Sequence, residues 1–215
     1  IEKKPSKRSP STPFTTSTLQ QEASRKIGFS PSLTMSTAQR LYEAGHITYM
    51  RTDSVNLSEE ALNNAEKIIY ENFGKEYHNK RVYKTKSKSA QEAHEAIRPT
   101  NLSNENAGKS ESEKKLYNLI WRRTLASQMS DSMFERTIVK IDLGDDKSFK
   151  ATGEVLVFDG FLRLYNENDD KSKLLPKLEE KSEIKIENIL SKEVFTKHPP
   201  RYSEASLIKK MEDSG

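Results

Sequence analysis

The residues with the clearest chemical potential are a tyrosine and an arginine two positions apart, Tyr49 and Arg51, in the run Ile47–Ser54. A free phenol has a pKa of about 10, so a tyrosine that attacks phosphorus needs a nearby base or positive charge. Residues 46–53 are predicted to be extended, and residues two apart on an extended chain point to the same side. Tyr49 and Arg51 could then face one phosphate, with the guanidinium donating to its non-bridging oxygens.

A second candidate segment runs from Gln91 to Thr100 and contains His94 and Arg98. Near neutral pH a histidine can carry a proton or donate to a phosphate, and an arginine can bind one. Each residue also has a structural alternative: Tyr49 as an aromatic on a half-buried strand, His94 as a satisfied histidine near a helix start, and the arginines as solvated charges. Generic chemistry alone therefore indicates a soluble, two-part module with DNA as a candidate partner.

The charge distribution agrees with a polyanionic partner. Of the net charge of +4, residues 1–10 contribute +3 and residues 75–90 contribute +5, which leaves −4 for the rest of the chain. Two basic stretches on a slightly acidic body favour nucleic acid as the partner, and solvated segments are the alternative.

Composition excludes several classes of protein. The sequence has no Cys, which rules out disulfides and thiolate metal sites and fits a cytoplasmic protein. No apolar run approaches the roughly 20 residues that span a bilayer, and no signal peptide opens the sequence, so no membrane partner is expected. The four histidines have no metal-ligand spacing, and no glycine-rich nucleotide loop occurs.

Hydrophobic periodicity predicts helices first and strands second, an α+β arrangement. The predicted helices cover about 18–27, 34–44, 58–73, 91–97, 110–129 and 204–211, and the predicted strands cover 137–143, 149–157, 160–165 and 184–194. Ser58 and Ser110 are predicted N-caps, whereas Ser30-Pro31-Ser32 indicates a turn. Gly144-Asp145-Asp146 is a hairpin signal.

Four blocks of sequence resemble bacterial type IA DNA topoisomerases, in the same order and at similar spacing: 13–23, 38–54, 91–100 and 199–207. The resemblance is closest to the topoisomerase I branch. It implies an α+β fold in which a helical domain carrying the catalytic tyrosine is followed by part of a β-rich arch domain, within a toroid of four domains. The implied parts are a basic extended segment ending the first half of the arch (1–11), the helical domain (12–135), part of the arch (136–197) and the start of the return into the strand-binding domain (198–215).

The resemblance also implies residue roles. Tyr49 is the nucleophile that forms a 5′-phosphotyrosyl bond, Arg51 contacts the scissile phosphate and His94 assists at the active site. The implied DNA-binding residues are Thr52, Asp53, Arg98, Arg201 and Ser203. The implied activity is ATP-independent: one strand is cut, another passes, and the break is resealed to relax negative supercoils. The implied partner is DNA, single-stranded or negatively supercoiled. A non-catalytic nucleic-acid-binding module of the same fold is the alternative.

Members of this family bind Mg²⁺ through acidic residues of a Toprim domain, and no such glutamate and Asp-x-Asp pattern occurs here. We therefore expect no metal site in these residues and no relaxation activity from them alone. Because strands of the arch come from both sides of the helical domain in the family, we also expect an unpaired strand edge that favours self-association.

Overall fold

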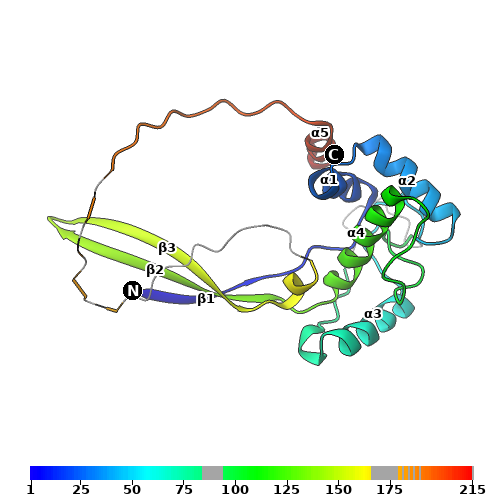
Figure 1. Ribbon diagram of the computed structural model, residues 1–215, viewed down its shortest axis with the longest axis horizontal. Coiled ribbons are helices and arrows are strands. Elements are labelled where there is room, and N and C mark those ends of the chain that lie inside the picture. Colours follow the sequence, from blue (N-terminus) through cyan, green and yellow to red (C-terminus); the bar gives the residue numbers. More distant parts are fainter. Residues whose placement is uncertain are drawn as a thin grey trace. The chain divides into compact units, whose positions relative to one another are not determined.

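The computed structural model describes residues 1–83, 94–165, 179–180, 182–183, 185, 187–188 and 190–214. The chain divides into two compact units (Figure 1). The strand unit comprises Ile1–Lys7, Met133–Phe158 and Asn168–Arg201, and the helical unit comprises Arg8–Ser132, Asp159–Glu167 and Tyr202–Gly215. Together they form the α+β fold that the sequence predicted, although the family-domain boundaries given above stay predictions.

The helical unit is organised around one long helix, α4. The helices are α1 (Thr16–Ile27), α2 (Pro31–Glu43), α3 (Glu59–Asn72), α4 (Glu111–Ser127) and α5 (Glu204–Ser214), with short 3-10 helices η1 (Lys75–Tyr77) and η2 (Gly160–Arg163). α4 contacts α1, α2, α3 and η2, and α5 packs on α1. The largest fully buried side chains of α4 are those of Leu116, Tyr117, Ile120 and Leu125. No described helix is both long enough and apolar enough to cross a membrane.

Local capping signals place most helix starts correctly. The Ser58 and Ser110 hydroxyls accept from the backbone N–H groups of Ala61 and Glu113, as predicted. The start of α2 was predicted three residues too late. Ser30 is its N-cap and Pro31 its first residue. The backbone N–H of a first helical residue has no acceptor within the helix, so a proline, which lacks that N–H, loses no hydrogen bond there. The predicted turn at 30–32 is therefore the first turn of the helix.

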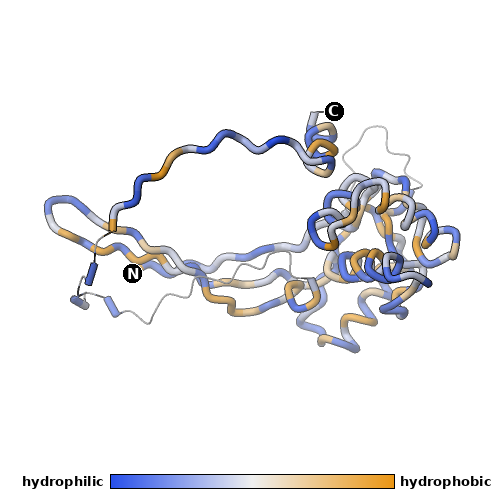
Figure 2. Tube along the Cα trace, turned by 45° about the horizontal axis from the view of Figure 1, so that its top comes forward, coloured by the Kyte–Doolittle hydropathy of each residue, from blue (hydrophilic) through white to orange (hydrophobic). Residues whose placement is uncertain are grey.

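The strand unit contains a three-stranded sheet in the order β1 (Glu2–Arg8), β2 (Ser132–Gly144) and β3 (Lys147–Phe158). β2 and β3 form the predicted antiparallel hairpin, with Lys140 paired to Lys150. Its turn is Asp145-Asp146, at φ values of 50° and 58°, the left-handed geometry of a type I′ turn. Figure 2 shows that this turn is hydrophilic.

Three predicted elements are wrong or fall outside the described residues. The strand expected at 160–165 is η2 instead, because Gly160 takes a φ of 49° and the N–H of Phe161 donates to Ser130. Of the strand expected at 184–194, residues 184, 186 and 189 lie outside the described residues, and no described residue of that range lies in a strand. Of the helix expected at 91–97, residues 91–93 lie outside the described residues and 94–97 are not helical.

The non-helical path of 94–97 follows from long-range pairing. The Ala96 N–H donates to Asn56 and the Ile97 N–H donates to Phe14, so both backbone donors bond to distant segments rather than within a helix. Ile97 forms an antiparallel bridge with Phe14, and Pro99 forms one with Ile47. Tertiary pairing has overridden local helix propensity in this segment.

An ion pair joins α2 to α4. The Arg40 Nε donates to Glu113 Oε1 at 3.0 Å, and the backbone N–H of Lys109 donates to Glu113 Oε2 at 2.8 Å. The backbone hydrogen bond from Lys109, followed by that from Arg40, lowers the pKa of Glu113 from 4.5 to about 2. The carboxylate thus stays charged in the folded chain at pH values where an unfolded glutamate binds a proton.

We expect the free energy of unfolding to decrease as the pH falls from about 4.5 to about 2. In this window the unfolded carboxyl binds a proton that the folded one resists, so acid favours the unfolded state. A Glu113→Gln variant should lose this part of the pH dependence, measured by urea denaturation at a series of pH values. Glu111→Gln, an exposed neighbour in the same turn, is the control, and equal slopes in wild type and Glu113→Gln would contradict the expectation.

Candidate active site around Tyr49

Tyr49 lies on a bent loop that follows α2. The backbone bends at His46, Thr48, Met50 and Arg51, so the extended segment predicted for this run is wrong. The geometric argument that places residues 49 and 51 on one side of a strand therefore does not apply. The bends arise because the loop is tied to other segments at both ends.

The loop anchors itself by burying the neighbours of Tyr49. Ile47 is 1% exposed and Met50 is 2% exposed, whereas the Tyr49 side chain is 45% exposed. An exposed aromatic between two fully buried residues is held outward by its neighbours rather than packed in a core. The phenol is thus accessible on a fixed stretch of backbone.

Hydroxyl groups of two threonines fix the path of the loop. On one side, the Thr48 N–H donates to the Arg98 carbonyl at 2.9 Å, and the Thr48 hydroxyl donates to the Ala96 carbonyl at 2.7 Å. On the other side, the Thr16 hydroxyl donates to the Met50 carbonyl at 2.8 Å and accepts from the Thr52 N–H at 2.9 Å. The start of α1 and the 94–100 segment therefore hold Tyr49 between them.

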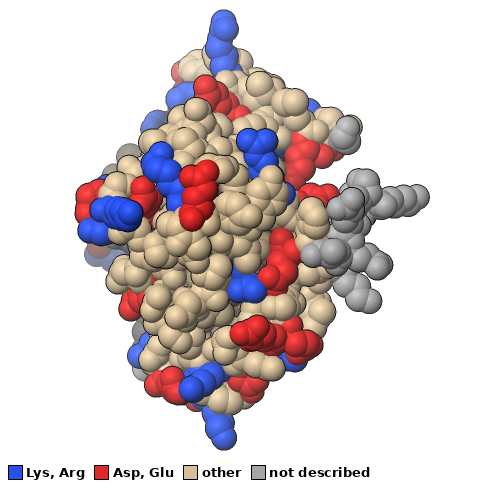
Figure 3. Space-filling model, turned by 90° about the vertical axis from the view of Figure 1, so that its right-hand side faces the viewer, with Lys and Arg blue, Asp and Glu red and all other residues tan. Residues whose placement is uncertain are grey.

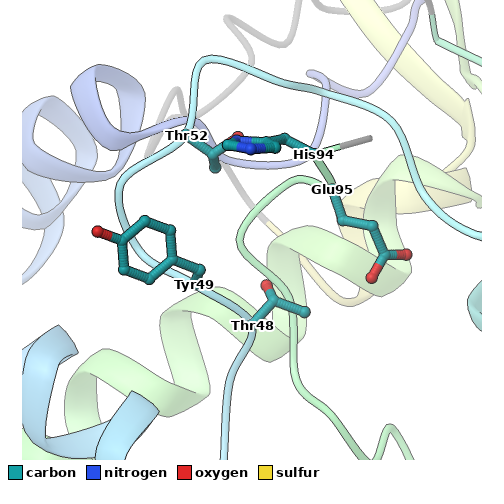
Figure 4. A pocket seen from close by; sticks show the side chains of 5 residues that line it. All are labelled: Thr48, Tyr49, Thr52, His94 and Glu95. Carbon is teal, nitrogen blue, oxygen red and sulfur yellow. The ribbon is translucent and has the colours of Figure 1, made fainter. Parts of the chain in front are cut away.

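A pocket of about 300 Å³ opens beside the tyrosine. It is lined by Thr48, Tyr49 and Thr52 from the loop and by His94 and Glu95 from the second segment (Figure 4). In this view the His94 ring lies beside Thr52, while the Tyr49 hydroxyl and the Glu95 carboxylate point in opposite directions. Glu95 is therefore not placed to accept a proton directly from Tyr49.

A second tyrosine contacts the first. Tyr42, in the last turn of α2, packs edge-on against the Tyr49 ring, with centroids 5.3 Å apart and planes at 65°. Edge-to-face pairs are a favourable arrangement of aromatic rings. Tyr42 thus supports the orientation of the Tyr49 ring through a contact between the two rings.

The structure brings together some of the predicted site residues. Tyr49, Thr52 and His94 share the pocket, whereas Arg51 and Asp53 are exposed and do not line it. Arg98 lies behind the pocket wall with its side chain only 14% exposed. Arg201 and Ser203 are exposed near the start of α5, where Ser203 and Ser206 bond to each other.

The residues that sequence reasoning missed are Thr48, Glu95 and Tyr42. The Glu95–Arg98 pair has the i,i+3 spacing of a local ion pair, which was a usable signal. The threonine clamp, meaning the hydrogen bonds that Thr16 and Thr48 form on either side of Tyr49, had no signal in the local sequence. The same holds for the Tyr42–Tyr49 contact, because both depend on which distant segments meet.

Basic charge near the helical unit is partly neutralised. In the described part of the 75–90 stretch, Lys80 pairs with Glu59 at 2.9 Å and Arg81 pairs with Asp131. On the face shown in Figure 3, acidic and basic side chains are interspersed outside the grey atoms. This face therefore offers no single broad basic patch among the residues that the structure describes.

Comparison with known proteins decides the family. The model of one protein family, DNA topoisomerase, matches residues 1–215. The chain belongs to the DNA topoisomerase family. It is 46% identical over 236 residues to DNA topoisomerase 1 of Rickettsia felis, covering 100% of this chain and 30% of that protein. It is 50% identical over 229 residues to DNA topoisomerase 1 of Helicobacter pylori strain 26695, covering 99% of this chain and 31% of that protein.

Among solved structures, the chain is similar to the full-length topoisomerase I from Thermotoga maritima. The TM-score is 0.78 at 39% sequence identity, over 99% of this chain and 36% of that one. These matches confirm the resemblance to topoisomerase I and the mixed helix-and-sheet fold. The chain spans about 30% of the length of the curated DNA topoisomerase 1 relatives named above.

Proposed function

We propose that this chain is the tyrosine-carrying part of an ATP-independent type IA DNA topoisomerase, with Tyr49 as its nucleophile. One observation carries the proposal: in a chain of the DNA topoisomerase family, an accessible phenol stands on a clamped loop at the rim of a pocket that also holds His94. A non-catalytic binding module would have no use for a fixed, outward-facing phenol beside a histidine. DNA, single-stranded or negatively supercoiled, is the proposed partner, in the cytoplasm.

The proposed reaction is a transesterification. The Tyr49 oxygen attacks a backbone phosphorus, a bond from phosphorus to tyrosine forms, and the bond from phosphorus to the 3′-oxygen breaks. The phenol proton is lost and the departing 3′-oxygen gains a proton, so the net change is an exchange of one phosphodiester for another. The 5′-phosphotyrosyl bond retains the energy needed for resealing, and the reaction therefore requires no ATP. A second strand passes through the break before the 3′-hydroxyl attacks in return.

The other candidate residues have proposed supporting roles. His94 faces the pocket, where an imidazole suits proton transfer or contact with a phosphate. Arg51 is exposed and is proposed to contact the scissile phosphate, with Asp53 orienting it and Thr52 beside it. Arg201 and Ser203 are proposed to contact the DNA backbone.

The proposed domain roles follow the family pattern. Residues 12–135 would form the helical domain that carries the tyrosine, and 136–197 part of the arch. Residues 1–11 would end the first half of the arch, and 198–215 would begin the return into the strand-binding domain.

Magnesium is proposed to act in the intact enzyme through acidic residues that lie outside this stretch. No group of three or more His, Cys, Asp or Glu side chains suited to a metal ion occurs among the described residues. The described residues do not by themselves fit a Mg²⁺ site.

We expect the isolated 215-residue chain not to relax a negatively supercoiled plasmid, with or without Mg²⁺, because positioning and charge neutralisation at the phosphate would be incomplete. The longer protein that contains this chain should relax the same plasmid when Mg²⁺ is added and lose that activity with a chelator. Both are measured by agarose gel electrophoresis. Relaxation by the isolated chain would contradict the expectation, and an inactive longer protein would contradict the proposed function.

The same isolated sample tests the expected self-association. β3 is an outer strand of the described sheet, and its side chains Val155, Leu156 and Val157 are 43%, 45% and 69% exposed. An exposed, apolar outer strand can pair with another chain. Sedimentation velocity should show a mass that increases with concentration, and a concentration-independent monomer would contradict self-association.

A further inference from the structure

An ion pair joins Glu95, which lines the pocket, to Arg98, which does not. The Arg98 Nη2 donates to Glu95 Oε2 at 2.7 Å, and its Nε donates to Oε1 at 3.3 Å. Glu95 Oε1 also accepts from the backbone N–H of Ser58 at 2.7 Å. Ser58 is the N-cap of α3, so one carboxylate ties the pocket wall to the start of a helix.

Two further donors of Arg98 are also directed at groups within the protein. Its Nη1 donates to the Pro99 carbonyl at 2.9 Å, and its Nη2 lies 3.5 Å from the Ser58 hydroxyl. The Arg98 side chain is 14% exposed. A phosphate would have to displace these partners to reach it, which argues against the direct DNA contact that the sequence predicted for Arg98.

The backbone of Arg98 reaches the nucleophile loop. The Arg98 N–H donates to the Thr48 hydroxyl at 2.9 Å, and the Arg98 carbonyl accepts from the Thr48 N–H at 2.9 Å. Thr48 immediately precedes Tyr49, and His94 immediately precedes Glu95. The pair is therefore linked to both candidate catalytic residues. Glu95 follows His94 in the sequence, and Arg98 is hydrogen-bonded to Thr48, which precedes Tyr49.

We propose that Glu95 and Arg98 form a positioning pair that fixes Tyr49 and His94 relative to each other, with neither residue contacting DNA. The proposal rests on the proposed function, because it assigns the pair a role in the attack by Tyr49. Small displacements of a nucleophile carry large rate penalties, since the reacting atoms must lie at contact distance and in line. Loss of the pair should lower the rate of strand cleavage more than the affinity for DNA.

The electrostatics of Glu95 agree with this role. Burial raises the pKa of Glu95, but the hydrogen bonds from Arg98 and Ser58 outweigh burial, and the pKa lies below its ordinary value. A carboxylate held charged by a guanidinium is a poor proton acceptor. It serves as a fixed anchor instead.

The test uses the full-length protein and a labelled single-stranded oligonucleotide. We expect Glu95→Gln and Arg98→Lys each to slow formation of the covalent adduct by on the order of tenfold or more, with the half-saturating oligonucleotide concentration changed by less than about twofold. If the two residues act as a pair, the double variant should be no slower than the slower single variant. Arg98→Lys also decides the matter if Glu95→Gln does not fold.

Glu22→Gln is the matched control for a merely structural effect. Glu22 forms an i,i+3 ion pair with Arg25 at 2.7 Å, and its side chain is 11% exposed, as buried as Glu95 or more so. Glu22 also accepts a hydrogen bond of 2.7 Å from the Tyr165 hydroxyl, and neither residue lines the pocket. Glu22→Gln should lower the melting temperature at least as much as Glu95→Gln while leaving the cleavage rate unchanged.

Three results would overturn the proposal. Wild-type cleavage rates in both Glu95→Gln and Arg98→Lys would exclude positioning. A raised half-saturating concentration at an unchanged rate would assign the pair to DNA binding. If Glu22→Gln slowed strand cleavage equally, the slower cleavage in the Glu95 and Arg98 variants would be a consequence of lost stability. An adduct that persists in a Tyr49→Phe variant would instead refute the proposed function itself, so the two failures are distinguishable.

Discussion

Replacing Tyr49 by phenylalanine in the full-length protein is expected to abolish the covalent protein–DNA adduct. The change removes one oxygen and keeps the ring, so the edge-on contact with Tyr42 and the buried anchors Ile47 and Met50 remain in place. Loss of a nucleophile typically lowers turnover by on the order of 10⁴-fold or more, because no neighbouring group can take over the covalent step. Plasmid relaxation should disappear with the adduct.

The measurement is a denaturing gel of a labelled oligonucleotide after incubation with Mg²⁺, together with a binding titration of the same oligonucleotide. Tyr49→Phe should bind with an affinity within a few-fold of wild type and show no adduct. Tyr70→Phe, at an exposed tyrosine on α3 outside the pocket, should form the adduct normally. An adduct in Tyr49→Phe would place the nucleophile elsewhere, and no adduct in the wild type would favour the non-catalytic binding module.

The largest loss of stability from a single small substitution is expected at Gly160, the first residue of η2. Its φ of 49° is left-handed, and an added Cβ would lie 2.5 Å from the Ser130 carbonyl oxygen and closer still to that of Asp131. Backbone strain of roughly 1–2 kcal/mol and overpacking of roughly 1–3 kcal/mol would act together. We therefore expect Gly160→Ala to lower the free energy of unfolding by about 3 kcal/mol.

Gly28→Ala separates the two contributions. Gly28 ends α1 at a φ of 69°, but an added Cβ there would meet no atom within 4 Å. It should therefore cost only the backbone term, about 1 kcal/mol. Both are measured by urea denaturation followed through Trp121, the single tryptophan, which lies buried on α4 in the helical unit. Equal losses of unfolding free energy in the two variants would show that the close approach of the added Cβ to the carbonyl oxygens at Gly160 does not destabilise the protein.

Features coded by neighbouring residues were predictable from the sequence. The serine caps of α3 and α4, the Asp145-Asp146 turn and the final helix α5 each depend on a few consecutive residues, and each was predicted. Ser30-Pro31 shows the limit of such signals, because the same residues suit a turn and a helix start. Only the packing of the apolar face of α2 distinguishes the two.

Features that depend on distant partners were not predictable. The segment at 94–97 satisfies a helical pattern, yet its backbone bonds to Phe14 and Asn56, which lie far away in the sequence. The same pairing converts the expected extended run around Tyr49 into a bent loop. Tyr49 and His94 were identified through the family resemblance. Glu95 had a local signal in its i,i+3 spacing to Arg98, whereas Thr48 became visible only when the segments that meet at the pocket were known.

The clamp around Tyr49 has a consequence for chemical modification of the site. Its bonds use backbone carbonyl and amide groups together with the hydroxyls of Thr16 and Thr48, and none involves the Tyr49 side chain. The course of the loop is thus independent of what residue 49 carries. Tyrosine analogues with altered acidity can be installed there on an unchanged backbone, so that the reactivity of the phenol can be varied separately from its placement.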